Sequence, residues 1–128
     1  MKLNLREQLV LAGVFRDGEY WAKQSWDGNG LRSTSQLGAY RIRIKDARQG
    51  LVPMNAGEWI GHTPTPSEAV MLHRAYKRLE SAGLLERSNQ SGYSDRTSHL
   101  RLSEAGEEMA RQLANREAEE RSPMMESA

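Results

Sequence analysis

Cysteine is absent from the 128 residues of this chain, and long apolar runs are absent as well. Without cysteine there is no disulfide, no thiolate nucleophile and no zinc site with sulfur ligands. No apolar segment approaches the roughly 20 residues that a membrane-spanning helix needs. Charged residues already stand at Lys2, Arg6 and Glu7, which is too early for a secretory signal. We therefore expect a cytoplasmic protein that does not contact membranes.

Histidine is scarce, and nothing else in the chain forms a catalytic motif. His62, His73 and His99 are 11 and 26 residues apart, whereas metal ligands on a helix stand within a few residues of each other. No serine lies in the strand-turn-helix setting of a nucleophile elbow. The sequence thus predicts no metal site, no cofactor and no enzymatic activity.

Net charge is only +1, but the charges are unevenly distributed. Segment 31–50 holds five basic residues and one acidic residue, and segment 67–101 holds six and four. Segment 103–128 holds three basic and seven acidic residues. A total of 27% charged residues is ordinary for a soluble domain, so the asymmetry supports binding to a polyanion without establishing it.

The most informative pattern begins at Thr65. Thr65 can cap a helix, Pro66 suits the first helical position, and Glu68 completes a capping box. Gly83 can adopt the left-handed conformation that ends a helix, so a helix is predicted over 66–82. Apolar residues recur at three- and four-residue steps and predict a buried stripe opposite a basic face. That stripe consists of Ala69, Leu72, Tyr76 and Leu79.

A β-hairpin and a further helix are predicted next. Segment 84–88 has the length and composition of a strand, and 89–95 is too polar to pack. Segment 97–102 places Leu100 and Leu102 on one side of a second strand. Ser103 then caps a helix with glutamates in its first two turns, where the helix dipole favours negative charge. The loop between the strands projects as a tip over 88–97.

This order of elements resembles the winged helix-turn-helix. The runs Arg74–Arg87, Asp95–Arg96 and Leu100–Gly106 resemble the multiple antibiotic resistance regulator (MarR) type of transcription factor. That family usually has Asp-x-Arg in the wing, whereas Asp95 and Arg96 are adjacent here. The resemblance implies a mainly α fold with a small β-hairpin wing (α+β). It also implies a homodimer that binds double-stranded DNA as a transcriptional regulator and that responds to a small-molecule effector.

The rest of the chain is predicted to complete one winged-helix domain, 1–128. Further helix starts are marked by a capping residue followed three positions later by Glu or Gln. Those pairs are Asn4 with Glu7, Ser33 with Gln36, and Asn55 with Glu58. A short edge strand over 51–54 is expected to pair with the hairpin. The predicted parts are a dimerisation helix (1–16), an aromatic and glycine-rich loop (17–35), the winged core (36–102), a C-terminal helix (103–118) and a disordered tail (119–128).

For DNA binding, helix 66–82 would enter the major groove and the tip 88–97 would approach the minor groove. Arg74 is expected to contact bases or phosphates, and Arg78 a phosphate. His73 lies at the flank of the helix. The complete predicted set is Ser67, Met71, His73, Arg74, Lys77, Arg78, Gln90, Tyr93 and Arg96.

Two alternatives remain open at this stage. Tyr20, Trp21 and Trp26 either line a ligand pocket or pack the loop onto the core. The domain either binds DNA, contacts double-stranded RNA or tRNA through the same surface, or is a protein-binding scaffold module without DNA binding. Neutralisation of the basic face would favour the scaffold, and the acidic candidates for that role are Glu68, Glu80 and Glu86.

Overall fold

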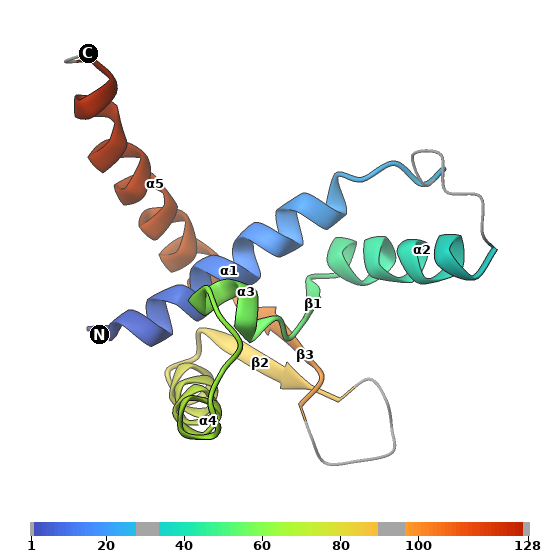
Figure 1. The fold of residues 1–128 in the computed structure, drawn as a ribbon, viewed down its shortest axis with the longest axis horizontal. Helices are drawn as coiled ribbons and strands as arrows, with labels where there is room; N and C mark the ends of the chain where they lie inside the picture. The colour runs from blue at the N-terminus through green and yellow to red at the C-terminus, as the bar shows by residue number, and fades with distance from the viewer. Residues whose placement is uncertain (1, 28–33, 90–96, 127–128) are drawn as a thin grey trace.

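The computed structural model describes residues 2–27, 34–89 and 97–126, and these are mainly helical with a small antiparallel sheet (Figure 1). The predicted fold class, mainly α with a small β part, is confirmed at that level. The elements in chain order are α1 (Leu5–Ala22), α2 (Thr34–Arg48), β1 (Leu51–Pro53), α3 (Ala56–Ile60), α4 (Pro66–Ser81), β2 (Leu85–Ser88), β3 (His99–Leu102) and α5 (Glu104–Glu126).

Local signals place the starts of α1, α4 and α5 and the end of α4 where the sequence predicts them. Asn4 and Thr65 form complete capping boxes with the third helical residue of α1 and α4. Ser103 accepts a hydrogen bond from the Gly106 N–H at the start of α5, and Gly83 has φ +76° directly after α4. Asn55 precedes α3 as predicted but forms no capping bond; its amide donates to the Glu58 carboxylate instead.

The three strands form one sheet in the order β1-β3-β2, with both pairs antiparallel. Leu85 pairs with Leu102, and Leu51 pairs with Arg101. The predicted edge strand is therefore confirmed as a partner of the hairpin. Residues 90–96, in the predicted tip, lie outside the described residues, as does Ser33 of a predicted capping pair.

Helix α1 is longer than predicted and α2 begins at Thr34, so the prediction that residues 17–35 form a loop is wrong for 17–22 and 34–35. Residues up to Ala22 are helical because tertiary contacts hold the last turns of the helix. The Trp59 indole donates a hydrogen bond to Asp17 over 2.8 Å, and Trp21 packs edge-on against Tyr40 with ring centroids 5.4 Å apart. Gly18 has no side chain to hinder the approach of Val52.

Helix α5 also continues past its predicted end, up to Glu126, so the predicted disordered tail is wrong for residues 119–126. Residues 119–126 include three Glu, one Arg and two Met, which have high helix propensity, although Pro123 in the same stretch does not. In Figure 1 the second half of α5 extends away from the rest of the chain. Among the described residues, no helix combines the length and the apolar character needed to cross a membrane.

The core lies around α1, which packs against α2, α3, α4, α5 and the sheet. Two glycines allow very close approach in this core. A Cβ on Gly13 would overlap the Trp59 ring, and a Cβ on Gly106 would overlap the Leu84 carbonyl oxygen. Apart from Trp59 and Tyr76 the buried core is aliphatic, with Val10, Leu11, Leu79 and Leu100 fully buried. This packing leaves one face of α4 turned away from the body.

Candidate nucleic-acid interface

Helix α4 has one buried face and one exposed face. Leu72, Ala75, Tyr76 and Leu79 are buried against the core, whereas Ala69 of the predicted stripe is exposed. The opposite face follows helical spacing along the whole helix. Its exposed side chains are Ser67, Val70, Met71, Arg74, Lys77 and Arg78. Of these, Val70 was missed by the sequence analysis, although its spacing from Ser67 and Arg74 places it on the same face.

Arg74 and Lys77 lie on this exposed face, and within the described part of the chain neither has a carboxylate oxygen within 4 Å. The Arg74 guanidinium donates to the sulfur of Met71 over 3.9 Å. The pKa of Glu80, which is lowered mainly by its hydrogen bond from Arg87, is lowered weakly by the charge of Lys77 as well. Two charges on one helix face therefore remain available to an external anion.

The glutamates that could neutralise this face are held elsewhere. Glu68 accepts from the Thr65 backbone N–H and lies 2.7 Å from the His62 ring nitrogen, and these contacts lower the pKa of Glu68. Glu80 pairs with Arg87 at 2.9 Å, and the hydrogen bond from Arg87 lowers the pKa of Glu80. Both carboxylates are thus directed away from Arg74.

Arg78 differs from Arg74 although both are exposed on α4. Its Nε lies 3.2 Å from Glu7 Oε2, and the Glu7 side chain is completely buried. The other oxygen of Glu7 accepts the Asn4 backbone N–H at 2.9 Å. The ion pair therefore ties the end of α4 to the start of α1. This geometry does not support the prediction that Arg78 meets a phosphate, because its release would leave a buried carboxylate unpaired.

His73 lies beside the basic face and lines a shallow groove of about 620 Å³ with Ala69, Leu72 and Tyr76. Burial raises the pKa of Tyr76 to about 12. His73 is thus at the flank of the exposed face, where the sequence analysis placed it. The predicted wing contacts Gln90, Tyr93 and Arg96 lie outside the described residues.

The aromatic residues around the end of α1 pack within the chain. Trp21 lies edge-on to Tyr20 and Tyr40, and the Arg43 guanidinium stacks on the Trp21 face at 4.2 Å. Arg41 lies 5.3 Å from the Trp26 ring centroid and donates to the Trp26 carbonyl. This arrangement supports the packing interpretation for Trp21, whereas Trp26 remains 47% exposed.

Two of the five basic residues in segment 31–50 also serve this junction. Arg41 donates to the carbonyl of Trp26, and Arg48 donates to the carbonyls of Ala22 and Gln24 at the end of α1. Arginine is suited to this role because its planar donors bind carbonyl oxygens at a helix C-terminus. On this segment Lys45 remains exposed.

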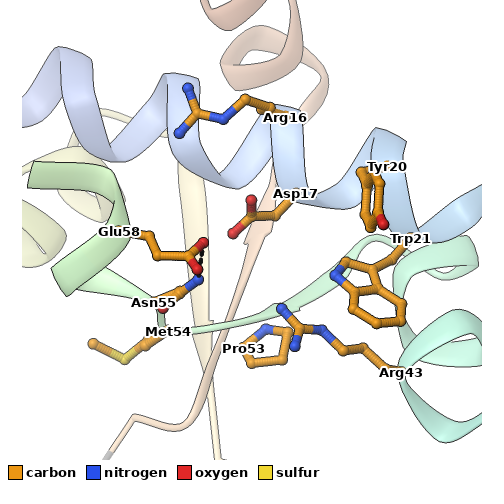
Figure 2. A pocket seen from close by; sticks show the side chains of 9 residues that line it. All are labelled: Arg16, Asp17, Tyr20, Trp21, Arg43, Pro53, Met54, Asn55 and Glu58. Carbon is orange, nitrogen blue, oxygen red and sulfur yellow. Dashed lines mark hydrogen bonds between the residues drawn. The ribbon is translucent and has the colours of Figure 1, made fainter. Parts of the chain in front are cut away.

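A pocket of about 550 Å³ nevertheless lies beside this cluster (Figure 2). Tyr20 and Trp21 line it, whereas Trp26 is not among its lining residues. The pocket also contains charged side chains that the sequence analysis did not select, because they come from separate helices. The charged lining residues are Arg16 and Asp17 from α1, Arg43 from α2 and Glu58 from α3.

Residues 2–27, 34–89 and 97–126 contain no cluster of three or more His, Asp or Glu side chains that could hold a metal ion. No protein-family model, no curated protein and no solved structure matches the chain.

Proposed function

We propose that this chain is a winged helix-turn-helix protein of MarR-like type that binds double-stranded DNA through α4 and acts as a transcriptional regulator. In this proposal α3 and α4 form the helix-turn-helix, and β2 and β3 form the wing. The observation that carries the proposal is the exposed face of α4, on which Arg74 and Lys77 have no carboxylate partner within 4 Å.

The order and pairing of the elements support this reading. A helix of 16 residues with a complete N-terminal capping box is followed by a left-handed glycine and an antiparallel strand pair. An α-helix fits the major groove of DNA, and its exposed cations would neutralise phosphates beside the bases that it contacts. Ser67 and Met71, near the start of α4, would lie closest to base edges.

The same observations argue against a scaffold that binds protein only. That alternative requires the basic face to be neutralised by acidic neighbours. Glu68 and Glu80 instead pair with His62 and Arg87, and Glu86 lies opposite Arg101 in the sheet register. Arg74 and Lys77 would therefore carry their charge to the DNA.

The proposal is tested by fluorescence anisotropy with a random-sequence DNA duplex over a series of salt concentrations. We expect binding that weakens steeply with salt, because cations released from the DNA drive the association. Arg74→Ala combined with Lys77→Ala should weaken binding at least about tenfold and reduce the salt slope by about 2, or about 1 for each lost phosphate contact.

A matched control removes two exposed positive charges outside α4. Lys23 and Lys45 are exposed and have no ion pair among the described residues. The variant Lys23→Ala with Lys45→Ala has the same net charge as the α4 variant and should bind almost like the native protein. Equal losses in the two variants would show that only net charge matters, and absence of native binding at low salt would refute the proposal.

A further inference from the structure

The pocket in Figure 2 contains opposite charges that do not pair with each other. Asp17 accepts a hydrogen bond from the Trp59 indole, and Glu58 accepts one from the Asn55 amide, both over 2.8 Å. Among the residues that the structure describes, neither carboxylate has a Lys, Arg or His nitrogen within 4 Å. In Figure 2 the two carboxylates point toward the same region of the pocket.

Arg43 is the complementary group on the other side of the pocket. Stacking on Trp21 at 4.2 Å fixes its guanidinium in place, and its Nε is buried without a hydrogen-bond partner. No carboxylate oxygen of the described residues lies within 4 Å of it.

We propose that this pocket binds a small zwitterion of the free amino acid class, with its ammonium group at Asp17 and Glu58 and its carboxylate on Arg43. Each contact would be a charge-assisted hydrogen bond, which is about twice as strong as a neutral one. Trp21, Pro53 and Met54 supply apolar walls for a ligand side chain. The volume of about 550 Å³ is within the range of small-molecule sites.

Simpler ligands fit this arrangement less well. A plain anion would be attracted by Arg43 but repelled by the two carboxylates, and a plain cation would experience the reverse. No third Asp, Glu or His side chain joins the two carboxylates in the described chain, so a metal ion would lack ligands. A zwitterion satisfies both ends of the pocket at once. The zwitterion proposal does not rest on DNA binding by α4, so the pocket is tested without DNA.

The test is isothermal titration calorimetry of the full chain with glycine, L-leucine and L-phenylalanine. Each amino acid is compared with its N-acetyl derivative, which lacks the ammonium group, and with its amide, which lacks the carboxylate. We expect saturable binding of at least one zwitterion, and binding of both derivatives at least about tenfold weaker, since each loses a charge-assisted contact. Quenching or enhancement of tryptophan fluorescence on titration gives a second readout, because Trp21 lines the pocket.

Three variants identify the contacts. Arg43→Gln and Glu58→Gln should each weaken binding at least about tenfold, because each removes one charge from a charge-assisted pair. Glu58→Gln retains a side-chain oxygen for the Asn55 hydrogen bond, which preserves the local structure. Lys45→Gln is the matched control, since Lys45 is exposed on the same helix as Arg43 and carries the same charge, but does not line the pocket. It should bind like the native chain.

Three results would overturn the proposal. The first is no binding of any of the zwitterions up to about 10 mM, which is above the millimolar Kd that weak small-ligand sites reach. The second is equal binding of an amino acid and its N-acetyl derivative, which would indicate a simple anion site. The third is an equal loss in Lys45→Gln and Arg43→Gln, which would indicate a general charge effect. None of these results depends on whether α4 binds DNA.

Discussion

Two arginines one turn apart on α4 have different environments. The Arg74 side chain has no acidic partner within the described chain, whereas Arg78 reaches a Glu7 carboxylate that is completely buried. The difference arises from α1, whose first turn lies beside the end of α4. Residue type and helix position therefore do not by themselves identify which arginine is available for DNA.

The first prediction concerns this ion pair. Arg78→Ala should lower the free energy of unfolding by about 2 kcal/mol, because it leaves a buried charge without its partner, although Arg78 itself is half exposed. Urea unfolding followed by circular dichroism measures the change. Arg74→Ala is the matched control and should stay within about 0.5 kcal/mol of the native protein, as is usual for an exposed side chain.

The DNA-binding assay separates the two roles further. Arg74→Ala should weaken DNA binding, and Arg78→Ala should weaken it much less at temperatures where the variant is folded. The opposite result would be an Arg78→Ala variant that is as stable as the native protein but binds DNA weakly. It would show that Arg78 leaves Glu7 in solution. The original expectation of a phosphate contact would then hold.

At the scale of elements, helix starts are determined by local chemistry and helix positions by close packing. The capping boxes at Asn4 and Thr65 and the left-handed Gly83 involve residues within about one helical turn of each other. The approach of α5 to the sheet has a different origin. Gly106 lies directly against the Leu84 carbonyl, which comes from the far side of the hairpin.

The second prediction tests this approach. Gly106→Ala should destabilise the fold by about 2 kcal/mol, because the new methyl group would meet a backbone oxygen that cannot rotate away. Gly38→Ala in α2 is the control, since nothing lies within 4 Å of its added Cβ. It should stabilise α2 by about 0.5–1 kcal/mol through helix propensity. Equal melting temperatures for the two variants would contradict the packing of α5.

At the scale of the whole molecule, the outer surfaces of α1 and α5 are the candidates for a homodimer. Leu5 at the start of α1 is 71% exposed, and the second half of α5 extends away from the remaining chain (Figure 1). A dimer would present two copies of α4 to two DNA half-sites. It would also bury apolar surface that a single chain of this size leaves exposed to solvent.

The third prediction concerns this assembly. Sedimentation equilibrium should give twice the 14.5 kDa chain mass for the native protein. Leu5→Glu should shift it toward the monomer, because a charge would be buried at the interface. Ile42→Glu, at a residue 62% exposed on α2, should leave the dimer intact. A native monomer at micromolar concentration, or equal effects of the two variants, would contradict a dimer through α1 and α5.

The sequence by itself determined the helix starts at Asn4, Thr65 and Ser103, the turn at Gly83 and the exposed basic face of α4. These features depend on contacts within a few residues, so their signals are contiguous in the chain. The same locality explains why the paired strands were predictable, since β2 and β3 belong to one hairpin.

Only the tertiary structure decided where α1 ends, which arginines remain unpaired, and which side chains share the pocket. The Asp17–Trp59 hydrogen bond joins residues 42 positions apart, and the Glu7–Arg78 ion pair joins residues that are still further apart in the sequence. Arg43 and Glu58 come together with Asp17 because three helices meet there. Such contacts leave no periodic pattern in a sequence, because their geometry depends on how whole elements pack.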